Sequence, residues 1–415
     1  MSTRIFSFLS IFILVEVYCY QAFKTLFRKK PSIRYLYIGL HVFLYLALVG
    51  TFFLLPETRG KIGMVVSTII VGLIVPKSVI IFFLFGEDLV RVVRWIVGKI
   101  GHPKESSIPK TGSPSSSQSI PRSEFLSKVA LATASVPFIA ITDGIIREKY
   151  NFQVRRVRVP IPGLPPQFEG FTITQLSDIH TGSFDSKKSV KAGIELANEQ
   201  GSDLMVFTGD IINNRIEEIH GYEDMLRSLH SPLGVYSSLG NHDYGDYYQW
   251  KSPQEKADHF QKVLEAHSQL GWNLLKNQNH IFTREDASLA LIGVENWGDK
   301  MFTRYGKIDE AIKGAEDAQV KILLSHDPTH WDRVVRTEQP GIHLTLSGHT
   351  HGSQIGVEIP GWVKWSPVQY IYKQWAGLYQ EGEQQLYVNR GFGFIGFSGR
   401  VGILPEITVI ELVKS

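Results

Sequence analysis

Cysteine is almost absent from this chain, since Cys19 is the only one among 415 residues. A single thiol cannot form an intramolecular disulfide, and it excludes a metal site built from several cysteines. The sequence also lacks a phosphate-cradling P-loop, which excludes an NTPase of that type, and it has no internal repeat. Its function must therefore depend on other residue types.

The C-terminal two-thirds lacks an excess of basic over acidic residues. Residues 1–150 hold 18 Lys and Arg against 8 Asp and Glu, whereas residues 151–415 hold 25 against 32, which gives net charges of +10 and −7. The basic excess therefore lies in the first third, where it can set membrane topology and meet anionic lipid headgroups. The acidic remainder offers no basic docking surface, and we expect no nucleic-acid partner.

Long apolar runs are confined to the first 150 residues. A membrane-spanning helix needs about 20 apolar residues, so these runs predict a transmembrane region over residues 1–100. The first run carries Glu16 but lacks a strong basic start and a small-residue cleavage site, which favours an uncleaved span over a signal peptide. Pro76 and Lys77 interrupt the third run. The predicted spans lie near residues 5–22, 34–55 and 62–85.

A Ser/Pro-rich stretch follows, and we expect residues 101–123 to be a disordered linker. Residues 124–143 are again apolar and predict a further span or a helix that lies at the membrane surface. The segment from Pro121 to Lys128 resembles a degraded twin-arginine export signal with one arginine missing. This resemblance favours an internal span derived from such a signal.

Basic residues flank the predicted spans unevenly. They cluster between the first two spans and after the third, with only Arg59 and Lys61 between the second and third. Both clusters favour the cytoplasm, so a spanning fourth segment puts the rest of the chain outside, whereas a surface-lying one leaves it inside. Basic residues from Arg147 to Arg158 favour the inside. We expect a multi-pass protein of the cytoplasmic (inner) membrane with its C-terminal domain outside the cytoplasm.

Five short polar motifs in the rest of the chain each follow an apolar run that predicts a buried strand. In open α/β sheets, ligands bind beyond the carboxyl ends of the strands, so motifs far apart in sequence can converge there. A lone Asp-x-His or Gly-Asp is common in loops, but the ordered set of five is hard to explain as structure alone. The motifs are Asp178-Ile179-His180 after Phe171–Leu176, Gly209-Asp210 after Leu204–Phe207, Gly240-Asn241-His242-Asp243 after Val235–Leu239, Ser325-His326 after Val320–Leu324, and Gly348-His349-Thr350-His351-Gly352 after Ile342–Leu346.

This order of motifs resembles the calcineurin-like metallophosphoesterase superfamily, and most closely its membrane-anchored bacterial branch. The similarity covers residues 155–412, including the tail segments Leu386–Gly393 and Leu404–Leu412. It implies an α/β fold in which two mixed β-sheets pack face to face as a sandwich flanked by helices. The domain would occupy residues 150–415, and about 260 residues is a reasonable size for a single domain.

The resemblance also implies two divalent metal ions as cofactors, held by carboxylate, amide and imidazole groups. A shared carboxylate can hold two ions about 3.5–4 Å apart. A ligand set without thiolates favours Mn, Fe, Zn or Mg. In the family's pattern the first metal is bound by Asp178, His180 and His351, the second by Asn241, His326 and His349, and both by Asp210.

In the implied reaction, a hydroxide bridging the metals attacks phosphorus while the metals neutralise charge on the phosphoryl oxygens. His242 adjoins a ligand without being one, and it is the candidate general acid; its alternative role is to orient the loop. Many relatives have an Asp three residues after the bridging carboxylate, where this chain has Asn213. A neutral amide stabilises a protonated imidazole less than a carboxylate does, so Asp243 is a candidate partner for His242 instead.

Two arginines, Arg215 and Arg400, could donate to substrate phosphate, although a surface salt bridge is the default expectation for either. Aromatic residues are dense around positions 244–250 and 362–379. They could line a lipid or sugar part of the substrate, form a belt at the bilayer interface, or pack in the core. The membrane anchor favours a lipid-linked or cell-envelope phosphoester or diphosphate as the substrate.

Two other interpretations stay open at the level of sequence. A non-catalytic membrane scaffold could share the fold, although all seven ligand positions hold competent side chains. The N-terminal helices could sense or transport a molecule with the phosphoesterase as the output, although they show few polar residues along a pathway. The sequence favours a membrane-anchored, two-metal phosphoester hydrolase that is a phosphodiesterase or a phosphatase.

Overall fold

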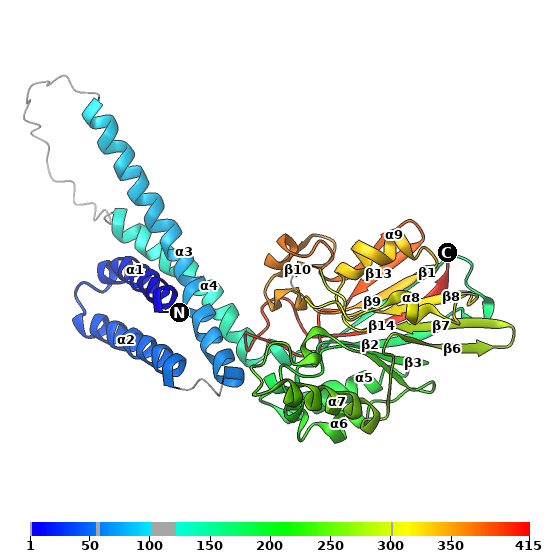
Figure 1. Ribbon diagram of the computed structural model, residues 1–415. Coiled ribbons are helices and arrows are strands. Elements are labelled where there is room, and N and C mark those ends of the chain that lie inside the picture. Colours follow the sequence, from blue (N-terminus) through cyan, green and yellow to red (C-terminus); the bar gives the residue numbers. More distant parts are fainter. Residues whose placement is uncertain (1, 55–58, 101–121, 300–301) are drawn as a thin grey trace, which may run out of the picture. The chain divides into compact units, whose positions relative to one another are not determined.

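The computed structural model describes residues 2–54, 59–100, 122–299 and 302–415. These residues form two compact units (Figure 1). The first is helical and lies within residues 1–142. The second contains residues 143–415 and the beginning of the third helix. The linker expected at residues 101–123 falls almost entirely outside the described residues.

The helical unit is built from long apolar helices. The segments 62–99 and 123–150 are long and apolar enough to cross a membrane. The third helix does not end at Pro76, so the interruption expected there does not break it. Lys77 ion-pairs with Glu16, which keeps both charges of the apolar runs partnered inside the unit. The helices are α1 (Ser2–Leu26), α2 (Pro31–Leu54), α3 (Arg59–Ile100) and α4 (Arg122–Ile146).

The second unit is a sandwich of two six-stranded mixed sheets, which confirms the predicted fold class. In the first sheet, β2 to β5 run parallel and β14 joins β2 in the antiparallel sense. In order across that sheet the strands are β1 (Gln153–Ile161), β14 (Glu406–Lys414), β2 (Thr172–Leu176), β3 (Leu204–Thr208), β4 (Val235–Ser238) and β5 (Trp272–Leu274).

The second sheet has parallel strands at its centre and an antiparallel pair at each side. Its order is β12 (Gly377–Glu381), β13 (Gln384–Val388), β9 (Leu344–Ser347), β8 (Val320–Leu324), β7 (Ala287–Gly293) and β6 (Gln278–Arg284). A separate hairpin, β10 (Val357–Ile359) with β11 (Val363–Trp365), follows β9 and joins neither sheet.

Apolar side chains fill the space between the sheets. Ile173 and Val206 of the first sheet and Leu291 and Ile322 of the second are fully buried in one cluster. Strands buried on both faces are continuous apolar runs, which is why the sequence indicated them. Helices cover the outer faces, as Figure 1 shows. They are α5 (Lys187–Asn198), α6 (Glu223–Arg227) and α7 (Pro253–Gln269) on the first sheet, and α8 (Ile308–Ile312) and α9 (Arg336–Glu338) on the second.

Candidate metal centre

The five motifs form turns at the carboxyl ends of β2, β3, β4, β8 and β9. The first two turns hold each other, because the backbone N–H of Asp178 donates to Gly209 O at 2.9 Å and that of His180 donates to Asp210 O at 3.1 Å. A left-handed backbone costs a non-glycine residue about 1–3 kcal/mol, and such residues cluster at functional sites. The residues in this conformation include Asp178, His180, Asp210, His349 and His351.

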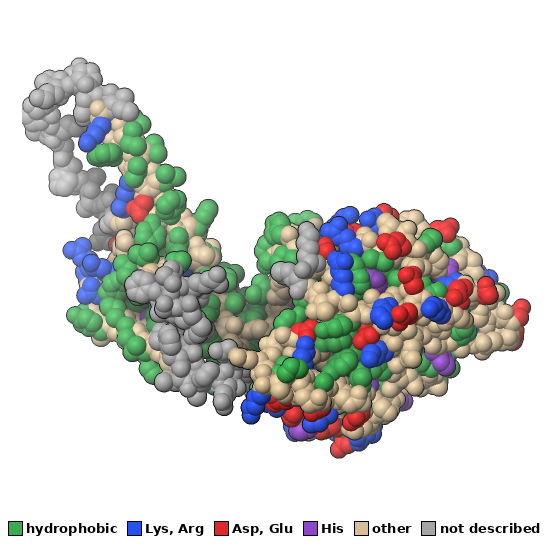
Figure 2. Space-filling view, in the orientation of Figure 1, with side chains coloured by type: hydrophobic (Ala, Val, Ile, Leu, Met, Phe, Trp, Pro, Cys, Tyr) green, Lys and Arg blue, Asp and Glu red, His purple; other side chains and the backbone are tan. Residues whose placement is uncertain are grey.

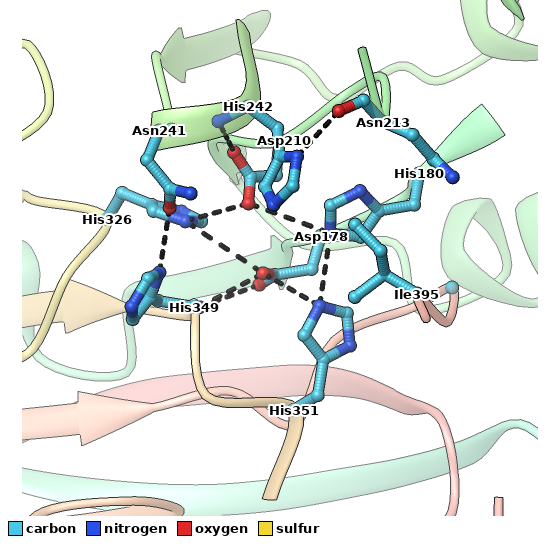
Figure 3. Close-up of polar contacts among 12 residues, drawn as sticks. Asp178, His180, Asp210, Asn213, Asn241, His242, His326, His349, His351 and Ile395 are labelled. Atoms are coloured by element: carbon cyan, nitrogen blue, oxygen red, sulfur yellow. Dashed lines mark hydrogen bonds and ion pairs between the residues drawn. The ribbon is translucent and has the colours of Figure 1, made fainter. Parts of the chain in front are cut away.

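All seven predicted ligands lie together at this edge of the sandwich (Figure 3). Asn241 Oδ1 is 2.8 Å from His349 Nδ1, so the amide lies beside the second of two groups of side chains. Within each group, one ligand atom per residue lies within 4.8 Å of the others. The first group is Asp178, His180 and His351, and the second is Asp210, His326 and His349.

The Asp210 carboxylate belongs to the second group and also faces the first. Its Oδ2 is 3.0 Å from His326 Nε2 and 3.6 Å from His180 Nε2. Its Oδ1 accepts a hydrogen bond from the backbone N–H of His242 at 2.8 Å. One oxygen therefore faces an imidazole of each group, which is the position that a shared ligand requires.

Main-chain carbonyls fix the orientation of two imidazoles. His180 Nδ1 is 3.1 Å from Ile212 O, and His326 Nδ1 is 2.7 Å from Thr208 O. A carbonyl can only accept, so each Nδ1 carries a hydrogen and each Nε2 is directed at the centre. His180 Nε2 also lies 3.1 Å from His351 Nε2. Nitrogens and carboxylate oxygens this close need a proton or a cation between them, so the donor set fits a metal site.

Burial and the neighbouring charged groups together determine which side chains of the centre are ionised. Burial raises the pKa of Asp178, but His351 and His326 outweigh it and hold that pKa below its usual range. Burial lowers the pKa of His326, but the carboxylates of Asp210 and Asp178 outweigh it and raise the pKa to about 10. Burial dominates at His180 and lowers its pKa. Without metal, the centre therefore holds ionised carboxylates beside the protonated imidazole of His326.

His242 lines an open cavity of about 240 Å³, together with the candidate ligands His180, Asp210, Asn241, His349 and His351. Its ring centroid is 5.0 Å from that of His180. Its Nδ1 is 2.6 Å from the main-chain oxygen of Asn213, while the Asn213 amide donates to Ser183 Oγ at 2.8 Å. Asn213 thus orients His242 through its carbonyl, which leaves Nε2 of His242 for another partner.

Asp243 does not take the place of a carboxylate partner for His242. The Asp243 side chain is fully buried and accepts hydrogen bonds from the backbone N–H groups of Gly240, Asp210 and Ile211 at 2.8, 2.9 and 3.0 Å. Burial, followed by the Asp210 charge, raises the pKa of Asp243 to about 7. Its contacts make it a positioning residue, because it ties the turn after β3 to the turn after β4.

The two arginines proposed as phosphate donors are placed differently. Arg215 Nε pairs with Glu217 at 3.1 Å, and the arginine side chain is 41% exposed, as expected of a surface ion pair. Arg400 is fully buried and donates to the carbonyls of Arg390 and Gly391 at 2.8 and 2.9 Å. Its Nη2 lies 3.4 Å from His351 Nδ1. The expectation that Arg400 binds substrate is therefore wrong, because it supports the loop behind His351.

The structure adds contacts that the motifs do not reveal. Tyr372 OH is 2.7 Å from His349 Nε2, and Tyr247 OH accepts a hydrogen bond from the Asn241 amide at 3.0 Å. The Phe302 ring meets His349 edge to face, with centroids 4.9 Å apart. The sequence indicated the two tyrosines only as members of aromatic clusters, because nothing in their spacing connects them with particular ligands.

Comparisons with known proteins agree with this geometry. Residues 171–353 match the family model described as "Calcineurin-like phosphoesterase", and residues 3–149 match "Probable Calcineurin-like phosphoesterase, transmembrane domain". The uncharacterized metallophosphoesterase YkuE of Bacillus subtilis is 32% identical over 60% of this chain and 81% of its own length.

Two further relatives also carry a membrane part or match the whole chain. An uncharacterized metallophosphoesterase of Campylobacter jejuni is 27% identical over 98% of both chains. The "Transmembrane protein with metallophosphoesterase domain" of Danio rerio is 26% identical over 66% of this chain, which spans 60% of that relative's length. The similarity to the Campylobacter jejuni relative therefore includes both the site-bearing unit and the N-terminal helices.

Proposed function

Because this chain belongs to the calcineurin-like metallophosphoesterase family, and is a hydrolase with a transmembrane domain, we propose that it cleaves phosphoesters with two divalent metal ions. The observation that supports a pair of ions is the position of Asp210, with one oxygen facing His326 and His180 of the two groups. The residues proposed for the first ion are Asp178, His180 and His351, for the second Asn241, His326 and His349, and for both Asp210.

Ions bound there would activate a water nucleophile and neutralise charge on the phosphoryl oxygens. His242 and Tyr247 line the same cavity as candidate ligands. A phosphoester bound at the ions would therefore lie against these side chains, which determine its position. We propose His242 as the proton donor to the leaving oxygen. The Asn213 carbonyl fixes its Nδ1, so a protonated ring presents Nε2–H to a bound ester.

The proposed substrate is a lipid-linked or envelope phosphoester or diphosphate. The cavity is small, about 240 Å³, so it accommodates a phosphoryl group and the beginning of its substituents but not a whole lipid. Apolar groups at its rim, among them Phe302 and Ile395, are compatible with an apolar substituent. The transmembrane domain would keep the site near such substrates.

For the location we propose a multi-pass protein of the cytoplasmic membrane whose catalytic domain is outside the cytoplasm. The basic clusters after the first and third apolar helices favour the cytoplasm, and α4 would then cross outward. The basic residues after α4 have another role, because Lys149 pairs with Asp185 and Arg155 with Glu358 in the folded domain. These basic residues are thus a weaker argument for placing the catalytic domain in the cytoplasm.

The test is hydrolysis of bis-p-nitrophenyl phosphate and p-nitrophenyl phosphate by the full chain in detergent. The protein is stripped of metal and reloaded with Mn, Zn or Mg, and Asp210→Asn is compared with Asp317→Asn, a change at an exposed acid. We expect metal-dependent turnover that falls at least about 100-fold in Asp210→Asn and persists in Asp317→Asn. Absence of metal binding by the wild type, or full activity of Asp210→Asn, would contradict the two-metal proposal.

A further inference from the structure

An exposed apolar surface lies beside the candidate metal centre. Among the described residues from 150 onward, seven of the ten large apolar side chains that are markedly exposed fall between positions 357 and 371. Trp362, Tyr370 and Ile371 are 82%, 78% and 74% exposed. Figure 2 shows hydrophobic side chains gathered where Figure 1 labels β10. We call this set the aromatic surface: Val357, Ile359, Trp362, Val363, Trp365, Tyr370 and Ile371.

The β10–β11 hairpin in this surface has its polar face towards the protein. Val357 pairs with Trp365 and Ile359 with Val363, so these four side chains share one face, and all are exposed. On the other face, Glu358 accepts a hydrogen bond from Arg155 at 2.7 Å.

Lys364, which pairs with Glu358 across the hairpin, also faces the protein. Lys364 donates to Ala376 O on the domain. An ordinary surface hairpin has its apolar face inside and its polar face in water. The reversed arrangement indicates that the apolar face meets an apolar environment.

The hairpin is held firmly to the ligand-bearing turn. Ser366 Oγ donates to Gly352 O at 2.6 Å, and Thr350 Oγ1 donates to Trp375 O at 2.6 Å. Tyr372, which directly follows Ile371, reaches His349. The aromatic surface is therefore a fixed extension of the rim of the centre.

The same part of the domain holds the end of α4. Arg400 N donates to Gly144 O at 3.1 Å, and Gly402 N donates to Glu148 at 3.2 Å. Val401, which lies between Arg400 and Gly402, contacts the beginning of the hairpin, because Gly356 N donates to Val401 O at 2.9 Å. Gly144 and Glu148, which both belong to the second unit, and the aromatic surface are thus fixed to one short segment, Arg400–Gly402.

We propose that the aromatic surface docks on the lipid bilayer in which the chain is anchored, at the boundary between headgroups and acyl chains. Trp and Tyr favour this boundary because they combine an apolar ring with a polar group. Charge agrees, since the only acid between positions 357 and 373 is Glu358, which Arg155 and Arg390 neutralise, while Lys373 is exposed to anionic headgroups. An exposed patch of this kind marks an interaction site.

Docking in this way would present the metal centre to phosphoesters at headgroup depth. This consequence rests on the proposed function, whereas docking itself does not require catalysis. The two can therefore fail separately.

The test uses the full chain in nanodiscs of mixed neutral and anionic phospholipids. Cys19→Ser removes the only natural thiol, so a cysteine introduced by Trp362→Cys accepts an environment-sensitive fluorophore at one position. The matched control is Asp317→Cys, an exposed site just before β8, at the opposite end of that strand from His326. Lipids with a quencher at the top of the acyl chain report contact with the bilayer.

We expect blue-shifted emission and quenching at position 362 and neither at position 317. Equal absence of quenching at the two positions would overturn the proposal. A blue shift without quenching that depends on the number of chains per disc would show that the aromatic surface contacts a second copy of this chain. That result would also overturn the proposal.

A triple variant tests the consequence for the substrate. Trp362→Ser, Tyr370→Ser and Ile371→Ser together should lower turnover of a bilayer-embedded phosphoester about tenfold, or about 1.4 kcal/mol, and leave turnover of a soluble ester unchanged. Equal turnover of the embedded ester by the variant would overturn the consequence. Quenching at position 362 in a chain that hydrolyses nothing would leave docking standing and reject the proposed function.

Discussion

Loading of metal into the metal-free centre should release the proton that His326 holds. In the metal-free chain the carboxylates of Asp210 and Asp178 overcome the effect of burial and raise the pKa of His326 to about 10. A metal accepts only the neutral imidazole, so binding must displace this proton. Burial lowers the pKa values of His180 and His349, so they bind without releasing one.

The magnitude follows from the gap between the pKa and the working pH. At about pH 8.5, His326 is still protonated and Asp243, with its pKa near 7, is ionised, so the wild type should release about one proton per chain more than a chain that lacks the His326 ring. The apparent affinity for metal should rise about tenfold per pH unit until the pH passes the pKa of His326. At about pH 7.5 the competing proton costs roughly 3 kcal/mol of metal affinity.

Isothermal titration calorimetry measures this release directly. Metal is added to the stripped full chain in several buffers of different ionisation enthalpy, and the slope of the observed enthalpy gives the number of protons. His326→Asn is the matched variant, because it keeps an oxygen ligand and removes the titrating ring. The reasoning is refuted if the wild type releases no proton at about pH 8.5, or if His326→Asn releases as many as the wild type.

Three further outcomes are expected. The pKa of His326 is higher in the folded than in the unfolded chain, so protonation of His326 stabilises the metal-free chain fully below about pH 6.5. This stabilisation is lost as the pH rises through about 10. Melting temperatures of the metal-free chain, but not of the metal-loaded chain, should therefore fall over that range. His242→Gln should lower kcat about 100-fold or more with metal content unchanged, measured by steady-state kinetics and metal analysis, and equal rates would exclude a proton donor. Arg400→Lys should lower the free energy of unfolding by about 2–4 kcal/mol, because an ammonium group cannot donate hydrogen bonds to all the carbonyls that the guanidinium contacts. An unchanged midpoint of denaturant unfolding would contradict this expectation.

The sequence predicted the central strands well and the peripheral ones poorly. The run Val320–Leu324 is β8 to the residue, because a strand covered on both faces must be apolar throughout. The hairpin Val357–Trp365 was not predicted as strands, because its apolar residues suggest burial and the structure exposes them. A single sequence records which residues are apolar but not which surface they meet.

The candidate site shows the same division. Candidate ligands such as Asp210 and His349 belong to motifs whose residue types and order carry the information. The partner of His242 was missed because it is the main-chain oxygen of residue 213, which any residue type supplies. Arg400 was misjudged for the same reason, since the groups that hold it are carbonyls and leave no mark in the sequence.

Backbone contacts of this kind also explain why the Asp-to-Asn difference at position 213 need not weaken the centre. A side-chain carboxylate would bring charge to His242, whereas the carbonyl brings a fixed acceptor at 2.6 Å. Charge for a protonated His242 is available from Asp210, whose carboxylate accepts the backbone N–H of the same residue and lies close to its ring. The orienting role and the charge-stabilising role, which one Asp could serve, are divided here between the Asn213 carbonyl and the carboxylate of Asp210.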